Sequence, residues 1–193
     1  MKKLFRWLIV AFLVSSLLGL SAVAVAWWLY GRDLPDVESL REVQLQVPLR
    51  VFTADGKLIG IFGEKRRIPV SLEDLPDCLA QAFIASEDAR FYEHPGVDYQ
   101  GLTRAAWSLL TTGEKSIGGS TITQQLARNF FLTTEKTFTR KIKEIFLALR
   151  IERELEKNQI LELYMNKIFL GYRAYGVGAA AEVYYAKSPD QSS

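Results

Sequence analysis

The sequence predicts a mainly α-helical domain that is preceded by one transmembrane helix and a small β-hairpin. Residues 7–31 contain no charged side chain, and a run of that length crosses the hydrocarbon core of a bilayer as a helix. Residues 49–70 alternate apolar and polar side chains around a turn dipeptide, which is typical of a hairpin. From residue 71 onward apolar residues recur at helical spacing, as at positions 142, 145, 146 and 149, so the body is predicted to be α.

Length and composition limit the classes of function. The 193 residues, less the apolar segment, leave room for one domain with a substantial core. The 24 basic and 22 acidic residues nearly balance, so we expect no nucleic acid among the partners. Cys78 is the only cysteine and cannot form an internal disulfide, and we expect it to be a small buried apolar residue.

The N-terminal apolar segment, residues 7–31, is expected to stay in place as a membrane anchor. Basic residues before a span favour a cytoplasmic N-terminus for residues 1–6, and those present are Lys2, Lys3 and Arg6. Aromatic residues lie where an interfacial belt is expected, at Trp27, Trp28 and Tyr30. A cleaved signal peptide is the competing interpretation, with small residues at 24–26, but the run exceeds the roughly 7–15 apolar residues of a signal peptide.

The remaining chain divides into a stalk and a domain. Residues 32–48 are mixed and polar, with prolines at positions 35 and 48, and we expect them to form a stalk. The domain then covers residues 49–193 and begins with a hairpin whose turn is Asp55-Gly56. The charged run at 64–67 is interpreted as a solvated edge.

Two adjacent carboxylates end a predicted helix in the first of four motifs. The motif consists of Glu87, Asp88, Phe91, His94 and Gly96. A glutamate there serves as a general base if burial or a second carboxylate raises its pKa. A Glu-Asp pair on its own is more often a solvated helix face. His94 has no cluster of metal ligands near it in sequence, so we expect it to shape the loop by hydrogen bonding.

A glycine-rich loop opens a helix in the second motif. Glycines at positions 113, 118 and 119 precede Ser120 and Thr121, and Thr121 with Gln124 fits a capping box. Gln124 and Gln125 lie one turn from Arg128, so amide groups and a guanidinium face one anion or sugar. The loop lacks the Gly-Lys-Ser/Thr ending of a nucleotide-binding loop, so we expect no use of ATP.

Basic residues precede a carboxylate by one helical turn in the third motif. Arg140 and Lys141 share a helix face with Glu144. They form either weak surface ion pairs or a clamp for a diphosphate leaving group beside a second carboxylate. The fourth motif places Tyr164 and Asn166 on one helix, where we expect structural hydrogen bonds.

The four motifs, in this order and at these separations, resemble the family 51 glycosyltransferase domain of class A penicillin-binding proteins and of their monofunctional relatives. The resemblance covers nearly all of the chain after residue 48, and residues 176–185 are similar to the start of a fifth motif. The anchor, the hairpin at 51–56 and the segment 63–70 further resemble 1A-type members from Gram-negative bacteria.

This resemblance implies a lysozyme-like, mainly α fold that polymerises lipid II, the undecaprenyl-diphosphate-linked disaccharide peptide. The product is a β-1,4-linked glycan strand on the outer, periplasmic face of the bacterial inner membrane. The implied partners are therefore lipid II, the growing glycan strand, the inner membrane and other cell-wall synthesis proteins. No cofactor is required by the sequence, and Mg²⁺ or Mn²⁺ at the diphosphate is left open.

The resemblance also implies residue roles. Glu87 is expected to be the base that accepts the proton of the acceptor 4-hydroxyl, with inversion at the donor anomeric carbon as undecaprenyl diphosphate leaves. Glu144 is expected to hold the basic cluster or a divalent ion in place. Implied substrate-binding residues are Asp88, Ser120, Thr121, Gln124, Gln125, Arg128, Arg140 and Lys141. Implied structural residues are Phe91, His94, Gly96, Tyr164 and Asn166.

The chain departs from the family near its end. Family members continue for several helices beyond the position of Ser193, and residues 184–187 read Tyr-Tyr-Ala-Lys where the family usually has Tyr-Phe-Gly-Lys. We therefore expect an incomplete glycosyltransferase domain with exposed apolar surface and poor stability. The sequence lacks a serine followed three residues later by lysine and lacks Lys-Thr-Gly, so we expect no penicillin binding.

Three functions stay open in order of preference. They are the glycosyltransferase, an inactive membrane-anchored fragment that binds lipid II or cell-wall partners, and a lysozyme-like hydrolase with two carboxylates. The hydrolase explains neither the anchor nor the basic cluster near Glu144. Two apolar stretches, 107–110 and 130–132, are expected either to dip into the membrane surface or to belong to the core.

Overall fold

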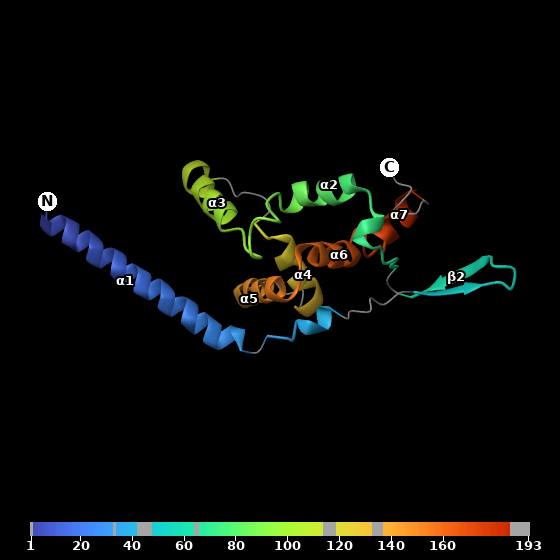
Figure 1. The fold of residues 1–193 in the computed structure, drawn as a ribbon, viewed down its shortest axis with the longest axis horizontal. Helices are drawn as coiled ribbons and strands as arrows, with labels where there is room; N and C mark the ends of the chain where they lie inside the picture. The colour runs from blue at the N-terminus through green and yellow to red at the C-terminus, as the bar shows by residue number, and fades with distance from the viewer. Residues whose placement is uncertain are drawn as a thin grey trace.

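The computed structural model describes residues 2–32, 34–41, 48–63, 66–113, 119–132 and 137–185. It confirms a mainly helical chain with one antiparallel hairpin. Figure 1 shows a helical body from which a long N-terminal helix extends on one side and the hairpin on the other. The elements are α1 (Lys2–Ala26), η1 (Trp27–Gly31), η2 (Glu38–Leu40), β1 (Leu49–Phe52), β2 (Leu58–Phe62), η3 (Leu72–Asp74), α2 (Asp77–Glu87), α3 (Tyr99–Thr112), α4 (Ile122–Phe131), α5 (Phe138–Glu154), α6 (Lys157–Lys167) and α7 (Val177–Tyr185).

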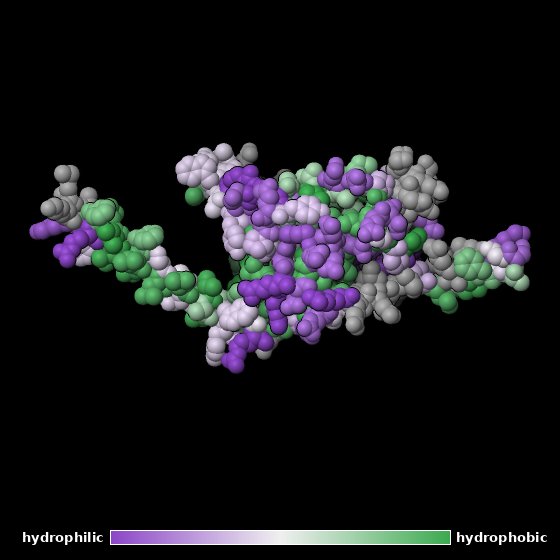
Figure 2. Space-filling model, in the orientation of Figure 1, coloured by the Kyte–Doolittle hydropathy of each residue, from purple (hydrophilic) through white to green (hydrophobic). Residues whose placement is uncertain are grey.

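The predicted membrane anchor is a continuous helix without protein around it. The span Phe5–Gly31 is long enough and apolar enough to cross a membrane. Its large apolar side chains are exposed on all sides, and Figure 2 shows this helix as a green rod outside the body. A helix that is apolar all round needs either a protein or a lipid environment. Its last turn is π-helical, and the Trp27 ring there packs edge-on against Phe146 of α5, with centroids 5.1 Å apart.

The segment expected to be a stalk contributes to the core instead of only spanning a distance. Leu34, Val37 and Leu40 are buried within the main hydrophobic cluster. Arg41 follows them and donates a 2.6 Å hydrogen bond to the carbonyl of Glu154, the last residue of α5. Apolar residues spaced by three along a short 3₁₀ turn place their side chains on one side, so even a polar segment presents an apolar face. The expected stalk residues 33 and 42–47 lie outside the described residues.

The hairpin forms where the sequence predicts it. Leu49 pairs with Phe62 and Val51 with Gly60, and the register shifts by one residue at Phe52 next to the turn. Gly56 adopts φ +83° in that turn, a conformation that favours glycine. Of the charged run 64–67, residues 64 and 65 lie outside the described residues, Arg66 is exposed, and Arg67 is buried instead of solvated. Burial lowers the pKa of the Arg67 guanidinium.

The core lies between α4, α5 and α6, at the centre of the body in Figure 1. Helix α4 packs against both of the other two. The side chains that meet there are fully buried and come from all three helices: Ile122, Leu126, Leu147, Ile151, Leu161 and Tyr164. Thr121 and Thr137 cap the N-termini of α4 and α5 through their hydroxyls, as expected of N-cap residues.

The buried stripe of α5 differs from the stripe that its apolar pattern indicates. The apolar positions 142, 145, 146 and 149 are only partly buried, whereas the fully covered positions are 144, 147, 148 and 151. The base of the anchor covers part of the first stripe through Phe146. The helix is as predicted, but two faces of it are occupied, because the anchor packs on one side and the core on the other.

The two apolar stretches have different fates. Phe130, Phe131 and Leu132 pack against the core. Trp107 and Leu110 are exposed, with 70% and 82% of their surface accessible, on α3, none of whose described side chains is in the core.

The expectation for Cys78 is wrong: it lies in the first turn of α2 and is exposed.

Candidate active site

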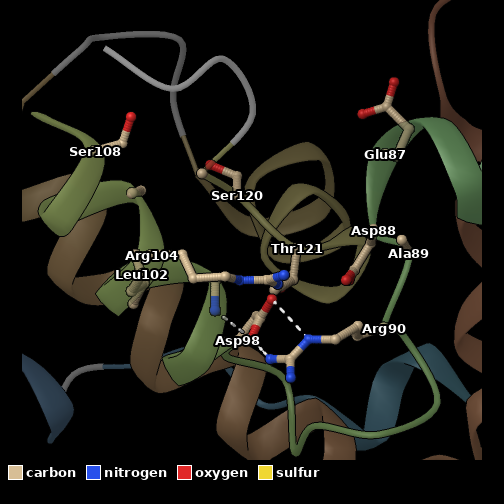
Figure 3. Close-up of a pocket in the computed structure, with 13 residues that line it drawn as sticks. Glu87, Asp88, Ala89, Arg90, Asp98, Leu102, Arg104, Ser108, Ser120 and Thr121 are labelled. Carbon is tan, nitrogen blue, oxygen red and sulfur yellow. Dashed lines mark hydrogen bonds and ion pairs between the residues drawn. The ribbon is translucent and has the colours of Figure 1, made fainter. Parts of the chain in front are cut away.

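A cavity of about 350 Å³ lies between the C-terminus of α2, one face of α3 and the loop that enters α4. Figure 3 shows side chains from all three segments around it. Four of the sequence-predicted site residues line it, namely Glu87, Asp88, Ser120 and Thr121. A concave site with convergent polar groups is the usual setting for substrate binding.

Glu87 is the last residue of α2 and its carboxylate is open to solvent. The Gln125 side-chain amide donates to it, with Nε2 2.8 Å from Oε2. Among the described residues, Gln125 is its hydrogen-bonding partner and no cation pairs with it. Figure 3 places this carboxylate at the edge of the cavity, apart from that of Asp88. It is therefore accessible to a proton on a bound hydroxyl group.

Asp88 is buried and joins the loop after α2 to the start of α4. The backbone amide of Gly96 donates to Nδ1 of His94 at 3.1 Å, so Nε2 carries the ring proton. That Nε2 lies 3.0 Å from each Asp88 oxygen, and the amide of Ile122 donates to Oδ2 at 3.1 Å. The carboxylate thus occupies the N-terminus of α4, where a negative charge is stabilised. The Phe91 ring is fully buried in the same loop.

Gly96 brings that loop into close contact with α5. Its φ is +94°, and a Cβ there would lie 2.9 Å from the carbonyl oxygen of Ala148. Its own carbonyl accepts a 2.6 Å hydrogen bond from the Thr121 hydroxyl, which also accepts from the amide of Gln124. The first and second motifs are therefore locked together through backbone groups.

Lys141 gathers the polar groups on the other side of Ser120. Its ammonium donates to the Ser120 hydroxyl at 2.8 Å, to Gln124 Oε1 at 3.1 Å and to Glu144 Oε2 at 3.2 Å. Glu144 is only 1% exposed, and its second oxygen lies 3.1 Å from Nε of Arg140. A buried carboxylate between two basic side chains holds both of them in place.

Glu144 does not fit the divalent ion that the sequence left open, because both of its oxygens face basic side chains. Within the described ranges there is also no group of three or more His, Cys, Asp or Glu residues that could hold a metal. We therefore derive no step through a protein-bound metal. The paired, buried state of Glu144 also argues against a second acid/base carboxylate for glycoside hydrolysis.

Gln125 links Glu87 to the core. Its Oε1 lies 3.5 Å from the hydroxyl of Tyr164, a long contact. Burial, and then the nearby negative charge of Glu87, raise the pKa of Tyr164 well above its usual range. Arg128 lies one turn along α4, and its positive charge acts on the same phenol in the opposite direction.

Asn166 lies away from the cavity and supports the segment that leads into α2. Its side-chain amide donates to the carbonyl of Val70 at 2.7 Å and accepts from the Val70 amide at 2.9 Å. Glu162, one turn earlier, accepts a 2.7 Å bond from the amide of Leu72. The fourth motif therefore contacts backbone groups about 90 residues earlier in the chain.

Sequence reasoning missed four charged or hydroxyl-bearing residues of the cavity. Arg90 pairs with Asp98 through Nη2 and Nε, and Asp98 also caps α3 by accepting from the amide of Gly101 at 2.8 Å. Arg104 and Ser108 line the same wall from α3. The N-cap position of Asp98 was readable as an acidic residue before a helix, whereas its pairing with Arg90 depends on how the loop closes.

Comparison with known proteins adds family information to this geometry. The family model described as Transglycosylase matches residues 55–192. Penicillin-binding protein 1A from Vibrio cholerae is 56% identical over 185 residues, which is 96% of this chain and 22% of that protein. The protein of the same name from Escherichia coli is 54% identical over 189 residues, covering 98% of this chain and 22% of that protein. The chain thus spans about a fifth of the length of these relatives.

A crystal structure of penicillin-binding protein 1A from Haemophilus influenzae also matches, with 34% identity over 77% of this chain and 12% of that one. Its TM-score is 0.33, so the likeness is carried by sequence and not by superposition.

Proposed function

The chain belongs to the transglycosylase family, and on that basis we propose that it is a peptidoglycan glycosyltransferase that polymerises lipid II into β-1,4-linked glycan strands. One observation supports this most: Glu87, a carboxylate that pairs with no cation among the described residues, lines the same cavity as Ser120, and the Ser120 hydroxyl accepts from the fixed ammonium of Lys141. A sugar transfer from a diphosphate needs these two groups, a base for the attacking hydroxyl and a positive charge for the leaving group.

The proposed reaction is one inverting displacement. The acceptor 4-hydroxyl gives its proton to Glu87 while its oxygen forms a bond to the donor anomeric carbon. The bond from that carbon to the diphosphate oxygen breaks, and its electron pair leaves with undecaprenyl diphosphate. Gln125 donates to the Glu87 carboxylate and so orients it at the cavity edge.

The leaving group is proposed to meet the basic cluster of the third motif. Lys141 is about 40% exposed, so its ammonium can exchange a protein contact for a phosphate oxygen. The buried carboxylate of Glu144 keeps both Lys141 and Arg140 in position. Gln124 shares the ammonium with Ser120, which places its amide beside the same oxygens. Arg128 and a substrate-borne Mg²⁺ or Mn²⁺ remain predictions for further neutralisation of the diphosphate.

Glycan formation from labelled lipid II in detergent tests the proposal. We expect polymer from the parent chain and a loss of about 10²- to 10⁴-fold in Glu87→Gln. Glu73→Gln is the matched control, because Glu73 is exposed in η3, outside the residues that line the cavity. Equal rates in the parent chain and Glu87→Gln would contradict the role of Glu87. Polymer formed only by a chain extended to the length of the relatives would show that this span holds the site but not the whole activity.

We also propose that α1 anchors the chain in the bacterial inner membrane, with residues 1–6 in the cytoplasm and the domain in the periplasm. Lys2, Lys3 and Arg6 support this orientation. The exposed and unique Cys78 offers a direct test. A membrane-impermeant maleimide should label the protein in cells whose outer membrane is permeabilised, and Cys78→Ser should abolish the signal. Labelling only after lysis of the inner membrane would reverse the orientation.

A further inference from the structure

Helix α3 presents a polar face to the cavity and an apolar face to the outside. Gly101, Leu102, Arg104, Ala105 and Ser108 line the cavity, and the polar side chains among them are Arg104 and Ser108, whereas Trp107 and Leu110 are exposed. In a water-soluble protein the apolar side of a surface helix normally faces inward. Helix α3 instead turns its charged side chain, Arg104, toward the cavity and leaves a tryptophan and a leucine outside.

Arg104 is the charged side chain on that inward face. Figure 3 shows its guanidinium reaching from α3 into the middle of the cavity. Across the described residues it makes no hydrogen bond or ion pair. The neighbouring cations differ in this respect, because Arg90 is paired with Asp98 and Lys141 with Glu144. Arg104 therefore brings an uncompensated positive charge to the cavity.

The position of Arg104 is supported from the base of α3. Asp98 caps the helix and at the same time pairs with Arg90, which follows Glu87 by three residues. Gln100, in the first turn, accepts from Arg90 as well. These contacts tie the wall that carries Arg104 to the segment that carries Glu87.

Two cations from two helices thus lie at or next to the cavity. Lys141 of α5 donates to its hydroxyl at 2.8 Å, and Arg104 of α3 lines the cavity together with it. A diphosphate carries negative charge on two linked phosphates, and a guanidinium is suited to bind phosphate oxygens in pairs.

We propose that Arg104 binds one phosphate of the lipid-linked diphosphate substrate while Lys141 binds the other, with Ser120 between them. This inference rests on the proposed function, because it names the group that the cavity recognises. It assigns to α3 a part in substrate binding that none of the four sequence motifs contains.

Binding of geranyl diphosphate and geranyl monophosphate to the detergent-solubilised chain, measured by calorimetry, tests the inference without turnover. We expect Arg104→Gln to weaken diphosphate binding about 10- to 100-fold, to near the affinity of the monophosphate. Monophosphate binding should change little, because Lys141 still holds it. Arg104→Lys should recover part of the loss. The matched control is Arg153→Gln, an exposed arginine in the last turn of α5.

Unchanged diphosphate affinity in Arg104→Gln would overturn the inference, as would an equal loss for both ligands. Polymerisation from labelled lipid II with a preformed lipid-linked glycan then identifies the source of the diphosphate. If the KM of only one substrate, lipid II or the glycan, rises in Arg104→Gln, then that substrate carries the diphosphate that Arg104 binds. If neither KM changes, the inference is also overturned. If the parent chain binds the diphosphate through Arg104 but makes no polymer, the proposed function fails and this inference does not.

Discussion

Two neighbouring carboxylates at the end of α2 have opposite surroundings. Asp88 is buried and accepts hydrogen bonds from an imidazole and from a helix N-terminus. Glu87 is exposed and accepts one from an amide side chain. Because both side chains leave the same helix end, one holds the loop to α4 while the other stays open to the cavity. Two adjacent acidic residues therefore differ in role: one makes a structural contact and the other is an accessible carboxylate.

Replacement of Gly96 by alanine should destabilise the fold. The backbone strain at φ +94° costs about 1 to 3 kcal/mol, and the contact of the new Cβ with the carbonyl oxygen of Ala148 at 2.9 Å adds to it. Thermal unfolding in detergent, followed by circular dichroism, measures the effect. Gly56→Ala is the control, because φ is +83° there and nothing lies within 4 Å. Equal losses would mean that close packing on α5 is unimportant.

The buried phenol of Tyr164 should make stability depend on pH above about 10. Its pKa is raised in the folded protein, so the unfolded chain releases this proton first as the pH increases. The contribution of Tyr164 to the free energy of unfolding should therefore be constant below pH ~10. Above that pH it should fall by about 1.4 kcal/mol per pH unit. Urea unfolding between pH ~8 and ~11 should show this extra fall, and Tyr164→Phe should lack it. Parallel curves for the two proteins would refute the assignment.

At the scale of elements, α3 and α5 each have two distinct faces, and each face has its own environment. Helix α5 contacts the core with one stripe and the base of the anchor with another. Helix α3 turns its polar face to the cavity and leaves Trp107 and Leu110 exposed. We interpret that outer face as a second contact with the bilayer beside the anchor, since interfacial helices insert tryptophan and leucine in this way.

Replacement of Trp107 and Leu110 together by serine should weaken membrane association of the domain without unfolding it, because neither side chain is in the core. Flotation with liposomes, with chains that begin at residue 33 so that the anchor does not dominate, measures the change. Phe138→Ser is the control, because Phe138 is 94% exposed at the start of α5. Unchanged flotation of the double variant would show that α3 does not touch lipid.

For the whole molecule, the N-terminal apolar helix is joined to the helical body by packed residues and not by a free tether. Trp27 contacts Phe146, and Leu34, Val37 and Leu40 enter the core. Helix α5 receives the anchor at Phe146 and carries Glu144 two residues earlier and Lys141 five residues earlier. The position of the basic cluster relative to the N-terminal helix is therefore set by direct contact.

A truncation series tests this integration. Chains that begin at residue 33 or at residue 42 both lack the anchor, but only the second loses Leu34, Val37 and Leu40. We expect the second to be less stable, by up to about 1.5 to 3 kcal/mol for each side chain lost. Urea unfolding of the two chains measures the difference. If the urea unfolding curves of the two chains have equal midpoints and slopes, residues 34–41 do not stabilise the core and act only as a stalk.

The sequence by itself determined the long apolar N-terminal helix, the hairpin, the helical body and the four motifs, because each is encoded over a few turns or by a short pattern. It also determined the family, since the order and spacing of the motifs match it. The tertiary structure decided that the predicted stalk packs into the core, that Cys78 is exposed, and that Glu144 is buried between two cations. It alone brought Arg104 and the Arg90–Asp98 pair to the cavity. These outcomes depend on which segments close on one another over long stretches of chain, and local periodicity carries no information about that closure.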